Sequence, residues 1–182
     1  YLSALQIFNI LIPLATYPYS IRILGSETYG LIIFALSIVT YFSMIINFGF
    51  TISATKDVSE NKNNNSKLNE IVSSVFIIKI FLWCVSFFFL LVLIAVIPTF
   101  RENWLLFFLV FGMTFNELLF PQWFFQGIEK MKYITIINII SKIVFASLIF
   151  IFIKQKEDYL LMPLFTSLGA LVGGGLSIYV VF

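Results

Sequence analysis

The sequence has few charged residues and lacks histidine altogether. Of its 182 residues, 11 are Lys or Arg and 9 are Asp or Glu, and none is histidine. A soluble domain has about a quarter charged residues, more than twice the 11% found here. The shortage therefore indicates a surface that faces lipid. The missing histidine removes the commonest general base and metal ligand, so hydrolytic or zinc chemistry is not expected.

Two further absences narrow the function classes. Cysteine occurs once, as Cys84 within an apolar run, so a disulfide within the chain and a thiolate metal site are excluded. The formal charge is only +2, which is too small to indicate a nucleic-acid partner. The sequence has no Gly-rich phosphate loop, so ATP is not expected to drive the protein directly, and no cofactor is predicted.

Long apolar stretches fill most of the chain instead. Hydrophobic residues make up 60% of it, and about 20 of them in a row suffice for a helix that crosses the hydrocarbon core. None of the stretches alternates with the period of two that barrel strands show. The predicted spanning helices are residues 1–21, 30–49, 71–97, 104–126, 133–153 and 159–182. The sequence thus predicts an all-α, polytopic membrane helix bundle.

The connections between these helices are short, except for residues 51–70. This segment contains Asn63, Asn64 and Asn65, and we expect a polar, mobile linker. The segments after the second and fourth helices hold five Lys, against four Lys and Arg after the first, third and fifth. The positive-inside rule then places the N-terminus and residues 51–70 in the cytoplasm.

Two charged residues lie near the predicted bilayer midplane. Glu117 lies twelve residues before Glu129, and Lys142 lies twelve residues after Lys130, on either side of the turn between the fourth and fifth helices. At about 1.5 Å per residue, an antiparallel helix pair places both side chains at one depth. Each charge costs about 2.5–3.5 kcal/mol at a helix centre. The two therefore predict either a structural ion pair or part of a hydrated pathway.

Other polar residues in the predicted helices each have two interpretations. The stripe of Thr135, Asn138, Ser141 and Lys142 recurs at helical spacing, and it either hydrogen-bonds across helices or lines a pathway. Lys79, about eight residues into the third helix, either extends to the interface or faces a pathway.

The ends of the helices carry two further motifs. Arg22, in the run YPYSIRILG, either grips a phosphate bidentately or anchors the helix end at the interface. The run FPQWFFQG is typical of an interfacial aromatic belt. A group of glycines in the sixth helix predicts close helix packing rather than a hinge, and consists of Gly169, Gly173, Gly174 and Gly175.

Several runs of the chain resemble the Wzx-type polysaccharide flippases. They are PYSIRILGSETYGLIIFA, NFGFTISATKDVSENKNN, RENWLLFF and, most specifically, FPQWFFQGIEKMKYITIINIISK. These flippases translocate O-antigen and capsule units, and they belong to the MOP superfamily together with lipid II flippases and MATE drug exporters. The resemblance covers essentially the whole chain, in the right order.

The resemblance implies a two-lobed bundle, of which residues 1–182 form the N-terminal six-helix lobe. The chain starts inside an apolar run and without Met, so we expect a fragment of a longer protein. The resemblance also implies flipping of undecaprenyl-diphosphate-linked oligosaccharide units from the cytoplasmic to the outer leaflet of the bacterial inner membrane, by alternating access. The implied partners are this cargo, the bilayer, a coupling ion (H+ or Na+) and a polysaccharide polymerase. Carried onto this sequence, it makes Arg22, Lys79, Glu117 and Lys142 candidates for lining the pathway, and the polar stripe of the fifth helix adds Asn138.

The residues leave rival functions open. A MATE-type exporter of small cations would need an acid-dominated cavity, whereas the intramembrane lysines favour an anionic cargo. A membrane-embedded polymerase or glycosyltransferase would need a large extramembrane loop with paired carboxylates, and residues 51–70 offer only Asp57 and Glu60 amid Asn and Lys. A non-transporting assembly subunit would have no need of charges at the midplane.

Overall fold

The structure is a computed structural model that describes the backbone of residues 2–181 and the side chains of residues 10–175 and 177. Within these residues the chain forms α-helices joined by short turns and two 3-10 helices. They are α1 Leu2–Leu24, α2 Ser26–Asn47, α3 Phe50–Glu60, α4 Asn65–Val96, α5 Pro98–Glu102, α6 Trp104–Phe111, η1 Gly112–Thr114, α7 Phe115–Leu119, α8 Gln122–Gly127, α9 Met131–Phe152, η2 Lys156–Leu160 and α10 Leu161–Val181.

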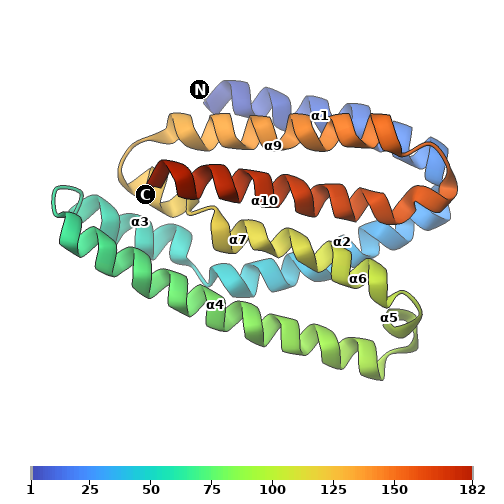
Figure 1. The fold of residues 1–182 in the computed structure, drawn as a ribbon, viewed down its shortest axis with the longest axis horizontal. Coiled ribbons are helices and arrows are strands. Elements are labelled where there is room, and N and C mark those ends of the chain that lie inside the picture. The colour runs from blue at the N-terminus through green and yellow to red at the C-terminus, as the bar shows by residue number, and fades with distance from the viewer. Residues whose placement is uncertain (1, 182) are drawn as a thin grey trace.

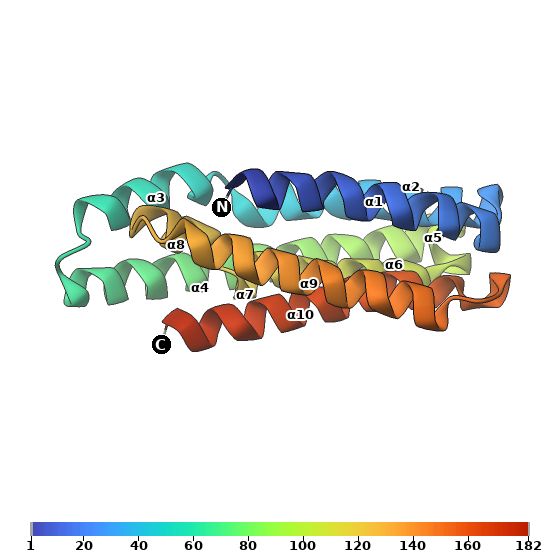
Figure 2. The ribbon, with the colours of Figure 1, turned by 90° about the horizontal axis from the view of Figure 1, so that it is seen from above.

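The long helices run along one direction of the molecule in both ribbon views (Figures 1 and 2). α9 packs between α1 and α10, α10 also packs on α7, and α2 packs on α4. The N- and C-termini lie at the same end as α3, and α5 lies at the opposite end (Figure 1). This arrangement leaves the middle of α1, α2, α7, α9 and α10 facing one another.

The described residues of the six predicted spans are mainly helical, and the exterior is apolar. Four segments in the described part of the chain are long and apolar enough to cross a membrane: Ser26–Glu60, Asn65–Val96, Trp104–Gly127 and Met131–Phe152. Ile10–Leu24 of α1 is a shorter apolar helix. Many large hydrophobic side chains are exposed along these helices, among them Ile77, Phe81 and Phe88 of α4. The prediction of an all-α, multi-pass membrane bundle is confirmed.

The prediction of a mobile linker at residues 51–70 is wrong. Residues 50–60 form α3, which packs against α8, and Asn64 begins α4 by accepting a hydrogen bond from the backbone N–H of Lys67 at 3.1 Å. Ala54 and Val58 lie four residues apart and are buried, so the polar residues of α3 occupy its other faces. Composition indicated a linker, but this apolar spacing makes an amphipathic helix.

The helical course of the chain is interrupted twice toward the end of the molecule that holds α3. The second predicted span ends, as expected, at Phe48 and Gly49, whose φ angles of 38° and 80° are left-handed, and the chain turns there into α3. The fourth, predicted as one helix over 104–126, narrows to a 3-10 turn at η1 and stops at Phe120 and Pro121. Because proline has no backbone N–H, Pro121 cannot continue the helical hydrogen bonds of α7. The two displaced segments, α3 and α8, pack on each other.

Aromatic side chains fill the core on the α5 side of these interruptions. Trp83 of α4 stacks on Phe87 with ring centroids 5.5 Å apart, and it also contacts Phe111 of α6. Its Nε1 donates to Thr114 Oγ1 at 2.8 Å, so the indole N–H is satisfied inside the bundle. This packing holds α4 against the fourth span and fixes the position of α7.

Candidate functional site

A cavity of about 430 Å³ lies inside the bundle, at the middle of the long helices. Its lining comes from α1, α2, η1, α7, α9 and α10 and is mainly apolar. The polar and charged side chains on its wall are Thr16, Tyr17, Ser43, Asn116, Glu117, Asn138, Ser141, Lys142 and Thr166. A cavity with both carboxylate and ammonium groups inside an apolar bundle is the setting in which membrane proteins handle polar cargo or ions.

The polar stripe of α9 supplies one wall of this cavity. Asn138, Ser141 and Lys142 line it, whereas Thr135 is buried elsewhere. Asn138 Nδ2 donates to Ile134 O at 2.9 Å, and Ser141 Oγ donates to Ile137 O at 2.9 Å. The expectation of hydrogen bonds across helices is therefore wrong for these two, because each bonds to the backbone of its own helix.

Glu117 also lines the cavity, from the short helix α7. Its side chain is half-buried, and its Oε2 accepts a hydrogen bond from Asn47 Nδ2 at 2.6 Å. Asn47 is the last residue of α2, directly before the turn at Phe48. The contact thus joins the end of the second span to the broken fourth span.

Lys79 of α4 approaches the same contact from outside the cavity. Its Nζ donates to Asn47 Oδ1 at 3.0 Å and to the backbone carbonyl of Glu117 at 2.8 Å. With 3% of its surface exposed, the side chain is buried between helices. The interpretation that Lys79 extends to the membrane interface is therefore wrong, because its ammonium finds two oxygen acceptors inside the bundle.

Glu117 and Lys142 share the cavity wall, as their predicted depths require. The ion pairs between described residues are Lys56 with Glu60 and Lys62 with Glu129. No ion pair therefore joins Glu117 to Lys142 in the described part of the chain, and the amide of Asn47 holds the Glu117 carboxylate instead. The alternative of an ion pair between these two charges is therefore wrong, and the alternative of a hydrated pathway stays a prediction.

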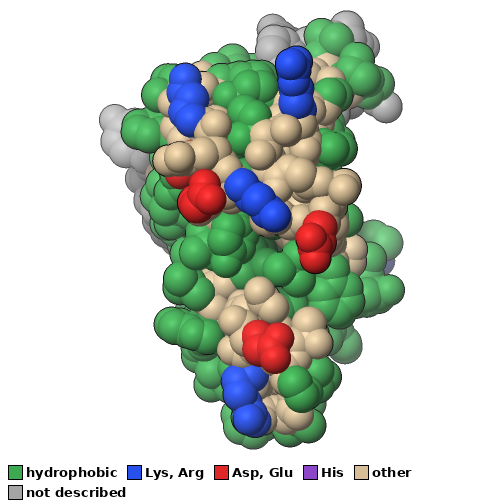
Figure 3. Space-filling view, turned by 90° about the vertical axis from the view of Figure 1, so that its right-hand side faces the viewer, with side chains coloured by type: hydrophobic (Ala, Val, Ile, Leu, Met, Phe, Trp, Pro, Cys, Tyr) green, Lys and Arg blue, Asp and Glu red, His purple; other side chains and the backbone are tan. Residues whose placement is uncertain are grey.

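Arg22 lies apart from the other predicted site residues. It occupies the last turn of α1 and is exposed, whereas the cavity is lined by residues 12–17 of that helix. Figure 3 looks onto this end of the molecule, where basic and acidic side chains are scattered between apolar ones. A helix-end arginine among mixed charges fits an interface anchor.

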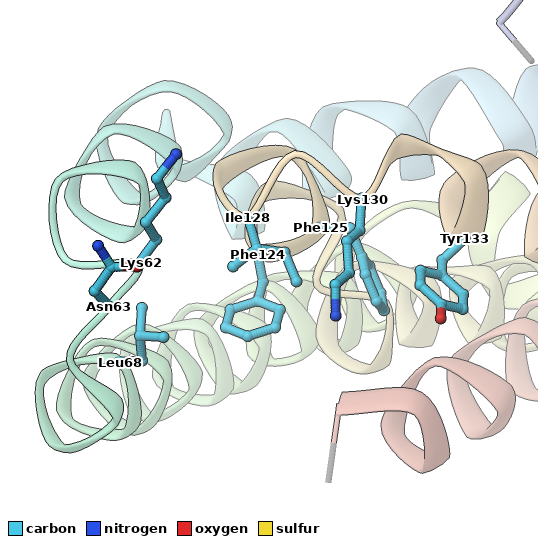
Figure 4. A pocket seen from close by; sticks show the side chains of 8 residues that line it. All are labelled: Lys62, Asn63, Leu68, Phe124, Phe125, Ile128, Lys130 and Tyr133. Atoms are coloured by element: carbon cyan, nitrogen blue, oxygen red, sulfur yellow. The ribbon is translucent and has the colours of Figure 1, made fainter.

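A second pocket, of about 370 Å³, lies near the turns at the α3 end. Figure 4 shows Lys62 and Asn63 of the α3–α4 turn on one side of it and Lys130 and Tyr133 on the other. Lys62 Nζ lies 3.1 Å from Glu129 Oε1, so part of its charge is neutralised. This pocket lies among the turns at one end of the bundle, and no carboxylate of the described residues lines it.

Sequence reasoning missed the partners that hold the broken fourth span. Asn47 was overlooked, and so were Ser167 and Ser177 of α10, which donate to Leu109 O at 2.7 Å and Leu119 O at 2.8 Å. One signal was available. Pro121 lies four residues after Glu117, and this spacing leaves the carbonyl of Glu117 without a helical donor.

The site offers no obvious place for a metal ion among the described residues. No group of three His, Cys, Asp or Glu side chains comes together there. The chemistry of the cavity rests instead on one carboxylate, one ammonium and several amides and hydroxyls. Such groups bind and orient polar molecules or ions through hydrogen bonds and charge.

Comparison with known proteins covers the whole chain. A family model described as "Polysaccharide biosynthesis protein" matches residues 1–182. Two curated relatives are each called "Putative O-antigen transporter". The one from Escherichia coli (strain K12) is 30% identical over 181 residues, which is 100% of this chain and 44% of the relative. The one from Shigella dysenteriae is 31% identical over 181 residues, which is 95% of this chain and 43% of the relative. The chain thus spans less than half the length of both relatives, and no solved structure gives a significant match.

Proposed function

Because the chain belongs to the polysaccharide biosynthesis protein family, as its resemblance to Wzx-type flippases predicts, we propose that it is the N-terminal lobe of a lipid-linked oligosaccharide flippase. The cargo is an undecaprenyl-diphosphate-linked oligosaccharide unit, which moves from the cytoplasmic to the outer leaflet of the bacterial inner membrane. The helices and the relatives support a multi-pass membrane protein of the polysaccharide pathway. The protein works as a transporter rather than an enzyme.

The observation that carries this proposal is the central cavity. Glu117, Asn138 and Lys142 bring charge and amide groups to the middle of an apolar bundle. A diphosphate and its sugars cannot cross hydrocarbon unaided, because every polar group stripped of water costs free energy. A cavity with such groups lowers this barrier, and rocking against a second lobe exposes it to each side in turn.

The two charges have different roles in this mechanism. Lys142 and Asn138 bind the cargo. The Lys142 ammonium attracts its phosphate groups, and the Asn138 amide hydrogen-bonds its sugar hydroxyls. Glu117 couples ion movement to transport. Its carboxylate binds H+ or Na+ as the cavity switches from facing one side of the membrane to facing the other. A polymerase on the outer face would receive the flipped unit.

The proposal is tested in a strain that lacks its own flippase and expresses the full-length protein. We compare wild type with Glu117→Gln and Lys142→Ala for surface polysaccharide at matched membrane levels. Loss of polymer, with lipid-linked units accumulating on the cytoplasmic face, supports flipping. Normal polymer from both variants would contradict the roles of these charges.

Two control variants sharpen this test. Lys132→Ala removes an exposed lysine of α9 outside the cavity, and Arg22→Ala removes the helix-end charge. Both are expected to support normal polymer. If the full-length wild type restores no polymer in strains of several sugar structures but exports small cations, the MATE-type exporter replaces this proposal.

A further inference from the structure

The break in the fourth span frees a specific backbone carbonyl. In an uninterrupted helix, the carbonyl of Glu117 would accept the N–H of residue 121. Residue 121 is proline, which has no N–H, and α7 ends at Leu119. An unsatisfied carbonyl inside a membrane bundle is costly, so a neighbouring group is required to donate to it.

Lys79 supplies that donor from a different helix. Its Nζ lies 2.8 Å from the carbonyl oxygen of Glu117, and 3% of the residue's surface is exposed. The carbonyl of Leu119, two residues on, is satisfied in the same way by Ser177 Oγ of α10. Side chains of neighbouring helices thus donate to the carbonyls that the break leaves without helical donors. Lys79 does so in α7, the helix that carries Glu117.

The same ammonium also fixes the orientation of Asn47. An ammonium can only donate, so the oxygen of the Asn47 amide must face Lys79, at 3.0 Å. The amide nitrogen then points the other way, toward Glu117 Oε2 at 2.6 Å. The ionised Glu117 carboxylate, which only accepts, favours the same orientation, so the ammonium and the carboxylate together fix the amide. A reversed amide would place its oxygen against the carboxylate.

We propose that Lys79 is a positioning residue for Glu117 and does not contact the cargo. It replaces the N–H that Pro121 lacks, and it orients Asn47 so that this amide holds the carboxylate on the cavity wall. This inference rests on the proposed function, because the carboxylate that it positions is the one assigned to ion coupling. It predicts that loss of Lys79 reproduces loss of Glu117 and leaves binding of the cargo unchanged.

The experiment uses the full-length transporter in proteoliposomes with a fluorescent lipid-linked oligosaccharide and an imposed H+ or Na+ gradient. Lys79→Met keeps the length of the side chain but removes both donors, and Lys79→Arg keeps them. We expect Lys79→Met and Glu117→Gln each to reduce the stimulation by the gradient about tenfold. In Lys79→Met the cargo concentration that gives half the maximal rate stays unchanged, and Lys79→Arg retains most of the gradient stimulation. The double variant Lys79→Met/Glu117→Gln is stimulated no less than Glu117→Gln alone.

A second variant guards against misfolding of Lys79→Met. Asn47→Leu removes the amide but leaves the bond between Lys79 and the Glu117 carbonyl, and it is expected to reduce the gradient stimulation as well. Lys132→Met, on an exposed face of α9, is the matched control and is expected to behave as wild type. A raised half-maximal cargo concentration with intact gradient stimulation in Lys79→Met would mean that Lys79 contacts the cargo, which overturns the inference.

A third readout does not depend on transport and separates the two proposals. Modification of Glu117 by a hydrophobic carbodiimide is followed in membranes by mass spectrometry. We expect the rate to rise severalfold in Lys79→Met and not in Lys132→Met, because the carboxylate loses its oriented amide donor. Absence of flipping by wild type would overturn the proposed function, whereas an unchanged modification rate would overturn the positioning role alone.

Discussion

The third and fourth spans are neighbours built in opposite ways. α4 runs without interruption for 32 residues. The fourth span is divided into α6 of 8 residues, a 3-10 turn, α7 of 5 residues and α8 of 6 residues. The continuous helix keeps its helical hydrogen bonds along its length, whereas carbonyls of the broken one accept from Lys79, Ser167 and Ser177 of other helices.

This difference shows where polar groups gather in the bundle. Lipid offers no hydrogen bonds, so irregular backbone is stable only where protein groups complete it. The donors drawn to the break in turn bring Asn47 and Glu117 together beside the cavity. The Glu117 part of the polar site therefore lies at the break in the helix, and variants that act on one span and spare the other can test whether the two depend on each other.

The largest effect is expected from Lys79→Met. It leaves the Glu117 carbonyl and Asn47 Oδ1 without their donor, at a cost of about 2–3 kcal/mol in the free energy of unfolding. Unfolding by sodium dodecyl sulfate in mixed micelles measures this. Lys132→Met serves as the exposed control, and equal stability of the two variants would contradict the role of Lys79 in the broken span.

A smaller loss of stability is expected from a change at the contact between α10 and the broken fourth span. A Cβ at Gly174 would overlap the side chain of Leu119, whereas a Cβ at Gly175 meets nothing within 4 Å. Gly174→Ala should therefore destabilise the protein by about 1–2 kcal/mol through overpacking. Gly175→Ala, the adjacent control, should be neutral or slightly stabilising in the same unfolding assay.

Ser177→Ala should cost less again, about 1 kcal/mol. It removes the hydroxyl that donates to Leu119 O but adds no steric clash. Ser37→Ala is the matched control, because that exposed hydroxyl donates to Ile33 O of its own helix, where the carbonyl keeps its helical donor. If both changes have the same effect on the unfolding free energy, the broken span does not depend on Ser177.

The smallest effect on the unfolding free energy is expected at the ion pair between the α3–α4 turn, which precedes the third span, and the α8–α9 turn, which follows the fourth span. Lys62 and Glu129 lie 3.1 Å apart, but 47% and 72% of their side-chain surfaces are exposed. Glu129→Gln should change the unfolding free energy by only about 0.5 kcal/mol, and added salt should reduce even this difference. A large, salt-independent loss would mean that this exposed contact matters as much as the buried ones.

The sequence predicted the class of fold, the helical spans and the level of Glu117 and Lys142, because apolar runs and residue spacing carry that information directly. It also predicted close packing at Gly173 and Gly174, where an added Cβ would collide with Ser141 and Leu119. The linker at 51–70 was mispredicted, since the buried pair Ala54 and Val58 is a weak signal within a polar segment.

The amino-acid sequence by itself determined that this chain lies in a membrane as apolar helices, and that the carbonyl of Glu117 has no helical donor at Pro121. Both follow from local properties, hydrophobicity over some 20 residues in one case and a missing N–H in the other. Only the tertiary structure decided which groups complete the break. Lys79 is 38 residues from Glu117 in the chain, and Asn47 is 70 residues from it. No spacing along the sequence encodes these contacts, because they depend on how separate helices pack.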